Sequence, residues 1–213
     1  MPEINNQLSG YLKILKNRGA ISLFQEIIEN TFFDFFYNVE TRFREGKSNR
    51  LTNHYAPTYY SVIKEVFNFI KKKNELILID VGCGKGKVLL VASDFEFKKI
   101  IGIDLSKRLI NICRKNINNY KNLKEKKKLI KLEQINALKY KITNENIFYF
   151  FDLFPEKILN KFLKKILLSF KKNKRIIYII FANPPKYNKL IEDNFKKCKI
   201  INRNTYNCII YKI

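Results

Sequence analysis

Three of the seven glycines in this 213-residue chain, Gly82, Gly84 and Gly86, occupy alternate positions in one segment, Asp-Val-Gly-Cys-Gly-Lys-Gly (80–86). Glycine lets the backbone turn sharply and approach a ligand closely, because no Cβ stands in the way. An apolar run precedes this segment and an amphipathic run follows it, which predicts a strand, a tight turn and a helix with free N–H groups at its start. An ordinary turn would need only one glycine, so the cluster favours a ligand site.

Two common phosphate-binding motifs do not fit this segment. A dinucleotide fingerprint requires glycine at position 87, and a P-loop requires a glycine five residues after Gly82, but that residue is Lys87. Acidic residues stand nearby instead: Asp80 precedes the glycines, and Asp104 ends the next apolar run. A carboxylate at a strand end can accept hydrogen bonds from two vicinal ribose hydroxyls, so a nucleoside ligand is predicted.

The elements around this site alternate regularly. Near-continuous apolar runs alternate with helical patterns, which predicts a parallel sheet buried on both faces. Two last runs, separated by a turn-forming segment, predict an antiparallel hairpin. We therefore expect an α/β fold: a doubly wound, seven-stranded, mostly parallel sheet built from five βα units and closed by the hairpin. The predicted strands cover residues 75–80, 98–104, 129–133, 147–152, 175–183, 198–201 and 207–213.

The amino-terminal part has a different character. Apolar residues recur at helical spacing from about residue 6 to residue 38, and the polar segment 44–54 follows. We expect a helical extension over 1–50 and the α/β domain over 51–213. Aromatic residues crowd the extension and predict a helical cap over the ligand pocket: Phe32, Phe33, Phe35, Phe36 and Tyr37.

The glycine segment and the Asp104 segment together resemble the class I S-adenosylmethionine-dependent methyltransferases, over about residues 52–213. The resemblance implies S-adenosylmethionine as cofactor. It assigns the methionine end of the cofactor to Asp80 and the glycine segment, including Cys83, the ribose to Asp104, and one face of the adenine to Leu105. Family members usually have a Gly-Asp-Ala-like turn after the third strand. Here the turn is Ile135-Asn136-Ala137, so Asn136 would meet the adenine amino group with an amide instead of a carboxylate.

Two further segments carry the resemblance. Tyr-Ala-Pro-Thr (55–58) resembles a stretch of seven-strand lysine methyltransferases, which makes Tyr55 and Thr58 cofactor-pocket candidates; helix capping by Thr58 and aromatic packing explain the pair equally well. Asp152 ends the fourth predicted strand, where the family places residues that face the transferred methyl group. It is the candidate general base and a further cofactor-site residue, although it could instead cap the next helix.

Asn183-Pro184-Pro185 resembles the catalytic motif of adenine and glutamine N-methyltransferases, but lysine follows it where an aromatic residue is expected. It also follows the fifth predicted strand, not the fourth. We therefore interpret it as a rigid turn at the exit of that strand.

The formal net charge of +23 comes mostly from lysine, which a low-GC genome explains by codon usage. Lysine runs precede the predicted strands, at helix carboxyl ends, where cations complement helix dipoles on the rim opposite the cofactor. A docking patch for an acidic partner or a membrane surface is the alternative interpretation of this rim.

Composition limits the remaining classes. No apolar run approaches the roughly 20 residues of a membrane span, and the first residues do not form a secretory signal, so we expect a cytoplasmic protein. The four cysteines form no Cys-x-x-Cys pair and His54 is the single histidine, which argues against a zinc site.

The sequence predicts methyl transfer to a small molecule or to a protein side chain such as lysine. Two alternatives remain open: a nucleic-acid methyltransferase or basic nucleic-acid-binding module, and a scaffold that binds the cofactor without turnover. The acceptor and the oligomeric state are not determined by the sequence.

Overall fold

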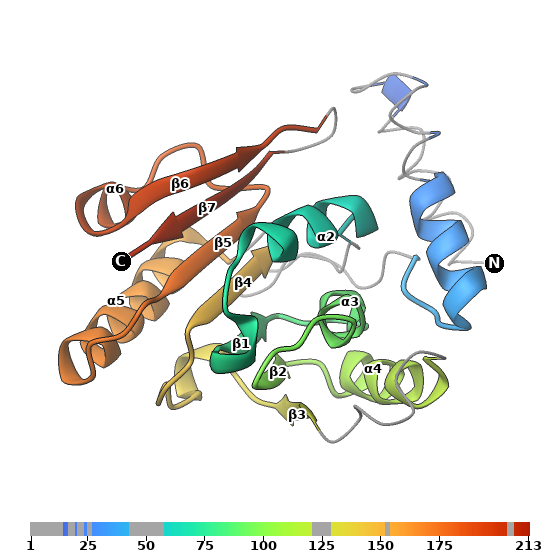
Figure 1. Cartoon of the computed structure of the whole chain (residues 1–213), viewed down its shortest axis with the longest axis horizontal. Coiled ribbons are helices and arrows are strands. Elements are labelled where there is room, and N and C mark those ends of the chain that lie inside the picture. Colours follow the sequence, from blue (N-terminus) through green and yellow to red (C-terminus); the bar gives the residue numbers. More distant parts are fainter. Residues whose placement is uncertain are drawn as a thin grey trace.

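The computed structural model describes residues 15, 16, 20, 24, 27–42, 58–120, 129–151, 154–203 and 207–213. A single sheet of seven strands, in the order β3-β2-β1-β4-β5-β7-β6, forms its centre (Figure 1). The strands are β1 (Ile77–Val81), β2 (Lys99–Asp104), β3 (Ile130–Gln134), β4 (Ile147–Phe151), β5 (Tyr178–Ala182), β6 (Lys196–Ile201) and β7 (Cys208–Lys212).

The predicted sheet topology is confirmed. The five strands β1 to β5 pair in parallel, whereas β7 pairs antiparallel with both β5 and β6. From β1 the chain builds outward through β2 and β3, then returns to the other side of β1 with β4. The order therefore reverses between β1 and β4, and ligands of open α/β sheets bind at the carboxyl ends of strands at such a switch point.

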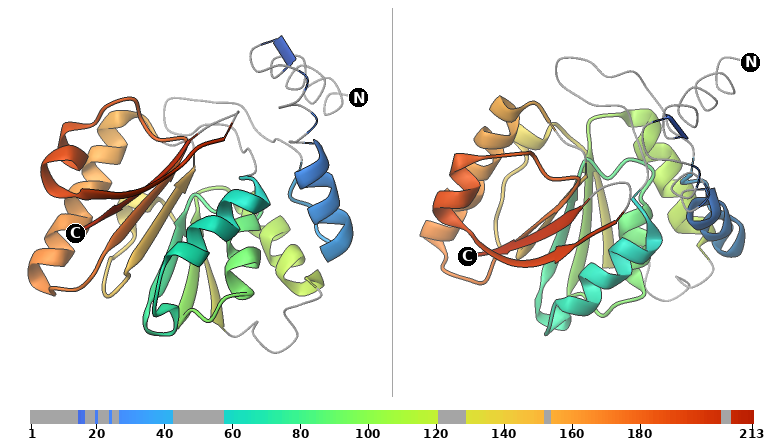
Figure 2. Two further views of the ribbon diagram at one scale, coloured as in Figure 1. Left: turned by 45° about the horizontal axis from the view of Figure 1, so that its top comes forward. Right: turned by 90° about the horizontal axis from the view of Figure 1, so that it is seen from above.

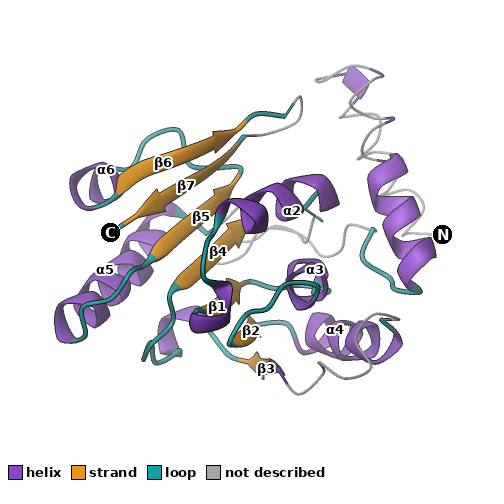
Figure 3. Cartoon of the chain, in the orientation of Figure 1, coloured by secondary structure: helices purple, strands orange, loops and turns teal. Residues whose placement is uncertain are grey.

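Helices cover both faces of the sheet (Figures 2 and 3). One buried cluster joins the sheet to α2 (Tyr60–Phe69), α3 (Lys87–Ser93) and α4 (Lys107–Asn119). A second joins the opposite face to α5 (Glu156–Lys172) and α6 (Lys189–Asn194). Neighbouring strand residues belong to different clusters, as Leu78 and Ile79 do, because successive side chains of a strand point to opposite faces.

Two local predictions are wrong. The third crossover carries no α-helix in its described residues: only the short 3-10 helix η4 (Ala137–Lys139) lies between β3 and β4, so the chain has four βα units and one nearly helix-free connection. Thr58 does not cap α2, because the N-cap position is Tyr59 and no side chain bonds there. The backbone of α2 starts one residue later than the capping pattern suggests.

In the amino-terminal extension, residues 27–37 form a continuous helix (blue in Figure 1). Glu29 anchors this helix to the first turn of α2, since its carboxylate accepts hydrogen bonds from the Ser61 N–H (3.0 Å) and hydroxyl (2.8 Å). Asp34 fixes the turn that follows, accepting from the backbone N–H groups of Thr41 and Arg42 at 2.7 and 2.8 Å. The predicted boundary at residue 50 falls outside the described residues.

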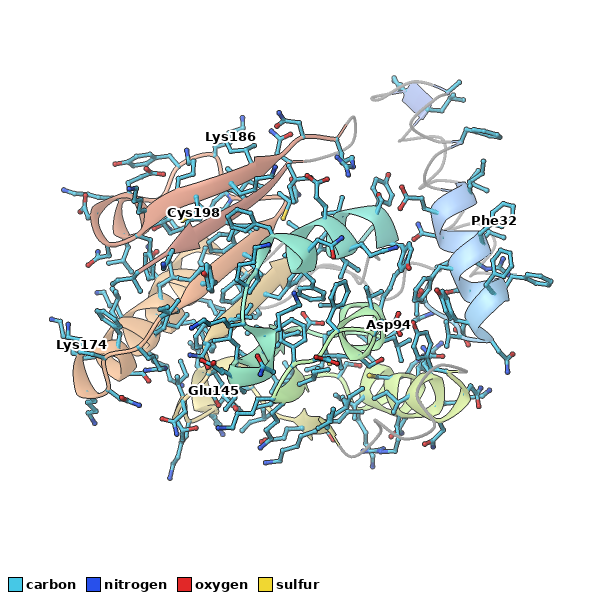
Figure 4. All side chains as sticks on the ribbon, viewed as in Figure 1. Phe32, Asp94, Glu145, Lys174, Lys186 and Cys198 are labelled. Atoms are coloured by element: carbon cyan, nitrogen blue, oxygen red, sulfur yellow. The ribbon has the colours of Figure 1, made fainter. Side chains whose placement is uncertain are left out.

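The aromatic residues of the extension do not act as one cap. Phe33 is buried at 3% exposure against α3 and Tyr120, whereas Phe32, Phe35 and Phe36 are 54%, 79% and 61% exposed. Figure 4 shows Phe32 on the side of the helix that faces away from the sheet. Helical geometry explains the split, because residues at adjacent positions of a helix point to different sides.

The lysine rim lies where the sequence predicts it, in the described part of the chain. Lys71 and Lys72 precede β1, Lys98 and Lys99 lie at the start of β2, and Lys171, Lys172 and Lys174 lie between the last turn of α5 and β5; all are exposed. The lysine run at 124–128 lies outside the described residues. Among the described helices, none has the length and apolar character needed to cross a bilayer.

Candidate functional site

The glycine segment leaves β1 and returns into α3 through three left-handed backbone positions. Gly82, Gly84 and Gly86 have φ values of 82°, 53° and 87°. The turn is held by the end of β2, because the N–H groups of Gly82 and Cys83 both donate to the Ile103 carbonyl, at 2.8 and 2.9 Å. These bonds press the loop, residues 82–86, against the carboxyl end of the neighbouring strand.

The glycines have different roles in this loop. A Cβ built on Gly82 meets no atom within 4 Å, so its side of the loop is open to an approaching molecule. A Cβ on Gly86 would instead collide with the Cys113 sulfur in α4. Gly82 therefore leaves room for a ligand, and Gly86 lets α3 and α4 pack closely.

Asp104 joins the loop to the start of α4. Its Oδ2 accepts from the Gly84 N–H at 3.0 Å and its Oδ1 from the Ser106 N–H at 2.7 Å. Burial raises the pKa of the Asp104 carboxyl, and hydrogen bonds from the backbone of Ser106, Gly84 and Leu105 partly counteract that rise. Since each carboxylate oxygen can accept more than one hydrogen bond, both can still receive a hydroxyl.

Asp80 lies at the end of β1, beside Gly102 in β2 and only 4% exposed. Burial and, second, the nearby negative charge of Asp104 raise its pKa well above the ordinary aspartate value. Two carboxyl groups therefore meet at the carboxyl ends of β1 and β2. This arrangement favours a partner that brings positive charge or hydrogen-bond donors.

The turn after β3 comes to the same edge of the sheet. The Ile135 N–H donates to the Asp104 carbonyl at 2.9 Å, which places Asn136 and Ala137 next to Asp104. The Asn136 side-chain oxygen accepts from the Leu138 N–H at 2.9 Å and so caps η4. That oxygen has a second lone pair for an amino group. Leu105, 47% exposed, adds an apolar surface on which an adenine ring could stack.

Of the other four predicted site residues, the structure describes two, Cys83 and Thr58. The Cys83 side chain is buried at 4% exposure against Gly102, so only its main chain can face a ligand. Thr58 is buried at 3% beside the start of α2. Tyr55 and Asp152 lie outside the described residues. The capping role considered for Asp152 does not hold at the N-cap of α5, which is Pro155 without a side-chain bond.

The Asn183-Pro184-Pro185 segment follows β5, as predicted, and not β4. Asn183 adopts a left-handed conformation with φ of 63°, and its N–H donates to the Asn207 carbonyl at 2.9 Å. The segment turns the chain away from the sheet beside β7.

The sequence prediction missed a set of buried polar side chains around the loop. Lys85 and Lys87 point into the protein and are 0% and 3% exposed. Glu40, Asn30 and Asn116 meet them from the extension and from α4. One feature of the sequence could have indicated this: Lys85 lies between two glycines of a tight loop. A long side chain at that position either extends into solvent or is buried in the protein.

These residues fit S-adenosylmethionine. The loop is open on the Gly82 side, the Asp104 carboxylate has capacity for two ribose hydroxyls, and Leu105 and Asn136 adjoin it for the base. The two carboxyl groups suit a ligand that carries a sulfonium and an amino group.

Comparisons with known proteins agree. A family model described as a methyltransferase domain matches residues 71–212, which is more than half of the chain. Over 67 residues the chain is 37% identical to a probable S-adenosylmethionine-dependent methyltransferase of Saccharomyces cerevisiae, covering 31% of this chain and 22% of that protein. Over 64 residues it is 31% identical to a protein-lysine N-methyltransferase of Saccharolobus islandicus, covering 30% of this chain and 40% of that protein. The chain thus spans less than half the length of either relative.

Solved structures show the same fold. An RNA methyltransferase from Salinibacter ruber, in complex with S-adenosylhomocysteine, superposes with a TM-score of 0.58 at 16% identity, covering 74% of this chain and 94% of that one. An S-adenosylmethionine-dependent methyltransferase from Aquifex aeolicus gives 0.53 at 16% identity, covering 70% and 88%. The matched family model spans the glycine loop, Asp104 and all seven strands, and the chain therefore belongs to the class I S-adenosylmethionine-dependent methyltransferases, with S-adenosylmethionine as its cofactor.

Proposed function

We propose that this chain transfers a methyl group from S-adenosylmethionine to a small molecule or to a protein side chain, with the lysine amine as the protein candidate. The observation that carries the proposal is Asp104, whose two carboxylate oxygens are held by the Gly84 and Ser106 N–H groups at the open edge of the glycine loop. A carboxylate oriented in this way is suited to a ribose.

The bound cofactor supplies an activated methyl group on a sulfonium. The chain has to bind and orient the reactants and exclude water, because placing the two reacting atoms at near-attack distance provides most of the rate gain. Asp104 holds the ribose hydroxyls in this proposal, Leu105 and Asn136 hold the adenine, and Asp80 with the glycine loop holds the methionine end. Thr58 and Tyr55 complete the pocket from the segment before α2.

A base is needed when the acceptor is a protonated amine or a hydroxyl. We assign this role to Asp152, which directly follows the last residue of β4. Phe151 pairs with Ala182 of β5, so the chain leaves β4 at the same edge of the sheet as the cofactor loop. Asp152→Asn is expected to lower the rate of methyl transfer and to leave cofactor affinity within a few-fold of the wild-type value.

The choice of acceptor rests on what surrounds the loop. The extension contacts the glycine loop directly, through Glu40 and Lys85, and in this proposal it covers one side of the site. Cover of this kind favours a small molecule or one inserted side chain over a long polymer. The match to a protein-lysine N-methyltransferase supports the lysine candidate, and the lysine rim lies at the strand amino ends, away from the site.

Two measurements test the proposal. In calorimetry we expect S-adenosylmethionine and S-adenosylhomocysteine to bind and NAD to bind far more weakly; tighter binding of NAD would contradict the cofactor site.

To identify the acceptor, cell extract is incubated with methyl-labelled cofactor and then separated into protein, RNA and small-molecule fractions. We expect label in the protein or small-molecule fraction, and label in RNA alone would overturn the acceptor class. Binding without label in any fraction would identify an inactive scaffold.

A further inference from the structure

Two lysine side chains of the cofactor loop region are buried, which is unusual for this residue type. Lys85 lies between Gly84 and Gly86 with 0% exposure, and Lys87 begins α3 with 3% exposure. A buried ammonium group is costly unless the protein supplies a partner, and partners for both come from the amino-terminal extension.

The ammonium group of Lys85 is paired with a carboxylate. Its Nζ lies 2.9 Å from Oε1 of Glu40, and the Glu40 side chain remains 51% exposed. The carboxylate therefore keeps part of its hydration while it neutralises a fully buried cation. This reduces the desolvation cost that weakens salt bridges in which both partners are buried.

Asn116 of α4 fixes the geometry of this pair. Its side-chain N–H group donates to the carbonyls of Lys85 (2.9 Å) and Glu40 (3.0 Å), and its oxygen accepts from the Glu40 N–H at 2.9 Å. One buried amide thus connects the backbone of the cofactor loop to the backbone of the extension. The Glu40 carboxylate is held at Lys85 by this connection.

Lys87 is stabilised in another way. Its Nζ donates to the Asn30 side-chain oxygen at 2.6 Å and lies 4.8 Å from the centre of the Phe33 ring. An amide oxygen and an aromatic face attract the ammonium without cancelling its charge. Glu40 thus brings a negative charge from the extension to the loop.

This charge matters because the cofactor is itself a cation at sulfur. We propose that Glu40 is a positioning residue of the cofactor site: it neutralises Lys85 so that the glycine loop of a strongly basic protein accepts a sulfonium. The inference rests on the proposed cofactor chemistry and adds to it a role for the extension. Glu40 and Lys85 act through the loop and need not touch the cofactor.

If Glu40 had only a structural role, its loss would change the Kd of S-adenosylmethionine and of S-adenosylhomocysteine equally. S-Adenosylhomocysteine lacks the sulfonium charge but shares the adenosine and the amino acid parts, so loss of the Glu40 charge beside Lys85 should weaken the binding of S-adenosylmethionine more. Two unit charges about 10 Å apart, at an effective dielectric of about 20, change Kd about 15-fold without salt. Salt lowers this effect, and it does so less for buried charges, so we expect a change of roughly 5- to 15-fold.

The experiment measures Kd for both ligands by calorimetry at pH 7, with thermal melting as a check on folding. Glu40→Gln should raise the Kd of S-adenosylmethionine roughly 5- to 15-fold and that of S-adenosylhomocysteine less than about threefold. Glu65→Gln is the matched control: it breaks ion pairs of α2 with Lys199 and Arg203, and should change neither Kd. Adding Lys85→Met to Glu40→Gln should restore the wild-type ratio of the two Kd values.

Lys85→Met alone keeps the inference testable if Glu40→Gln folds poorly. It leaves the Glu40 charge without its partner, so the ratio should move in the opposite direction, towards S-adenosylmethionine. Equal changes for both ligands, or no change in either variant, would overturn the role of Glu40 while the wild-type protein still binds. Failure of the wild-type protein to bind S-adenosylmethionine would instead contradict the cofactor site itself.

Discussion

At the scale of single residues, Asp104 connects the end of β2 to two other parts of the site, because its carboxylate accepts hydrogen bonds from N–H groups of the glycine loop and of the start of α4. We expect Asp104→Ala to weaken cofactor binding by about 1.5–3 kcal/mol, the usual loss for charge-assisted hydrogen bonds. Asp104→Asn should lose less, since one oxygen remains, although its amide nitrogen must face one of the two N–H donors. Calorimetry with S-adenosylhomocysteine measures both, and wild-type affinity in both variants would place ribose recognition elsewhere.

Asp80 illustrates the conflict between stability and binding. Its pKa is raised by burial and by Asp104, so the ionised carboxylate costs folding free energy at neutral pH. In Asp80→Asn we expect the unfolding free energy at pH 8 to equal or exceed that of the wild type, and the affinity for S-adenosylmethionine to fall.

The pH dependence of this difference has a definite sign. As pH falls through the raised pKa, the folded wild-type protein takes up a proton that the unfolded chain does not yet bind, so its stability rises and the advantage of Asp80→Asn disappears. Thermal melts of both proteins from pH 5 to pH 8 measure this. If Asp80→Asn were less stable than the wild type at pH 8, the raised pKa of Asp80 would be contradicted.

At the scale of elements, the glycine loop separates packing from ligand binding. Alanine at Gly86 combines a left-handed backbone, about 1–2 kcal/mol, with a collision against Cys113, about 1–3 kcal/mol. We expect Gly86→Ala to lower the unfolding free energy by about 2–5 kcal/mol. Gly82→Ala carries only the backbone strain, but its methyl group enters open space at the site, so cofactor affinity should fall more than stability. Denaturant unfolding and calorimetry on the two variants test this contrast. If Gly82→Ala mainly lost stability and Gly86→Ala mainly lost cofactor affinity, the roles given to the two glycines would be wrong.

At the scale of the whole molecule, the lysine rim and the cofactor site lie at opposite ends of the sheet. Lys171, Lys172 and Lys174 lie at the carboxyl end of α5, and Figure 4 shows Lys174 far from the amino-terminal helix. Changing all three to glutamine should leave cofactor affinity and methyl transfer to a small-molecule or protein acceptor intact. Retention on nucleic acid should weaken, and its salt slope should fall by about 0.9 for each phosphate that the variant no longer neutralises. A steep, salt-dependent rise in KM would indicate a nucleic-acid acceptor instead.

The sequence by itself determined the seven strands, the antiparallel hairpin that closes the sheet and the cluster of glycines with Asp104. These follow from local information: runs of apolar residues mark strands buried on both faces, and alternate glycines mark a turn with left-handed positions. The expected count of five βα units implied a helix after the third strand, where the structure describes only η4. Local reasoning also placed the N-cap of α2 at Thr58, one residue before the observed N-cap Tyr59. Several neighbouring residues can start a helix, and packing selects among them.

Only the tertiary structure decided how the extension meets the cofactor loop. Glu40 lies 45 residues from Lys85 and 76 from Asn116, and Asn30 lies 57 from Lys87. No periodicity links such distant positions, because each pair forms only after α3, α4 and the extension have packed together. A lysine between two glycines could equally have faced water. Burial of its side chain became favourable only because the folded chain brings a carboxylate to it.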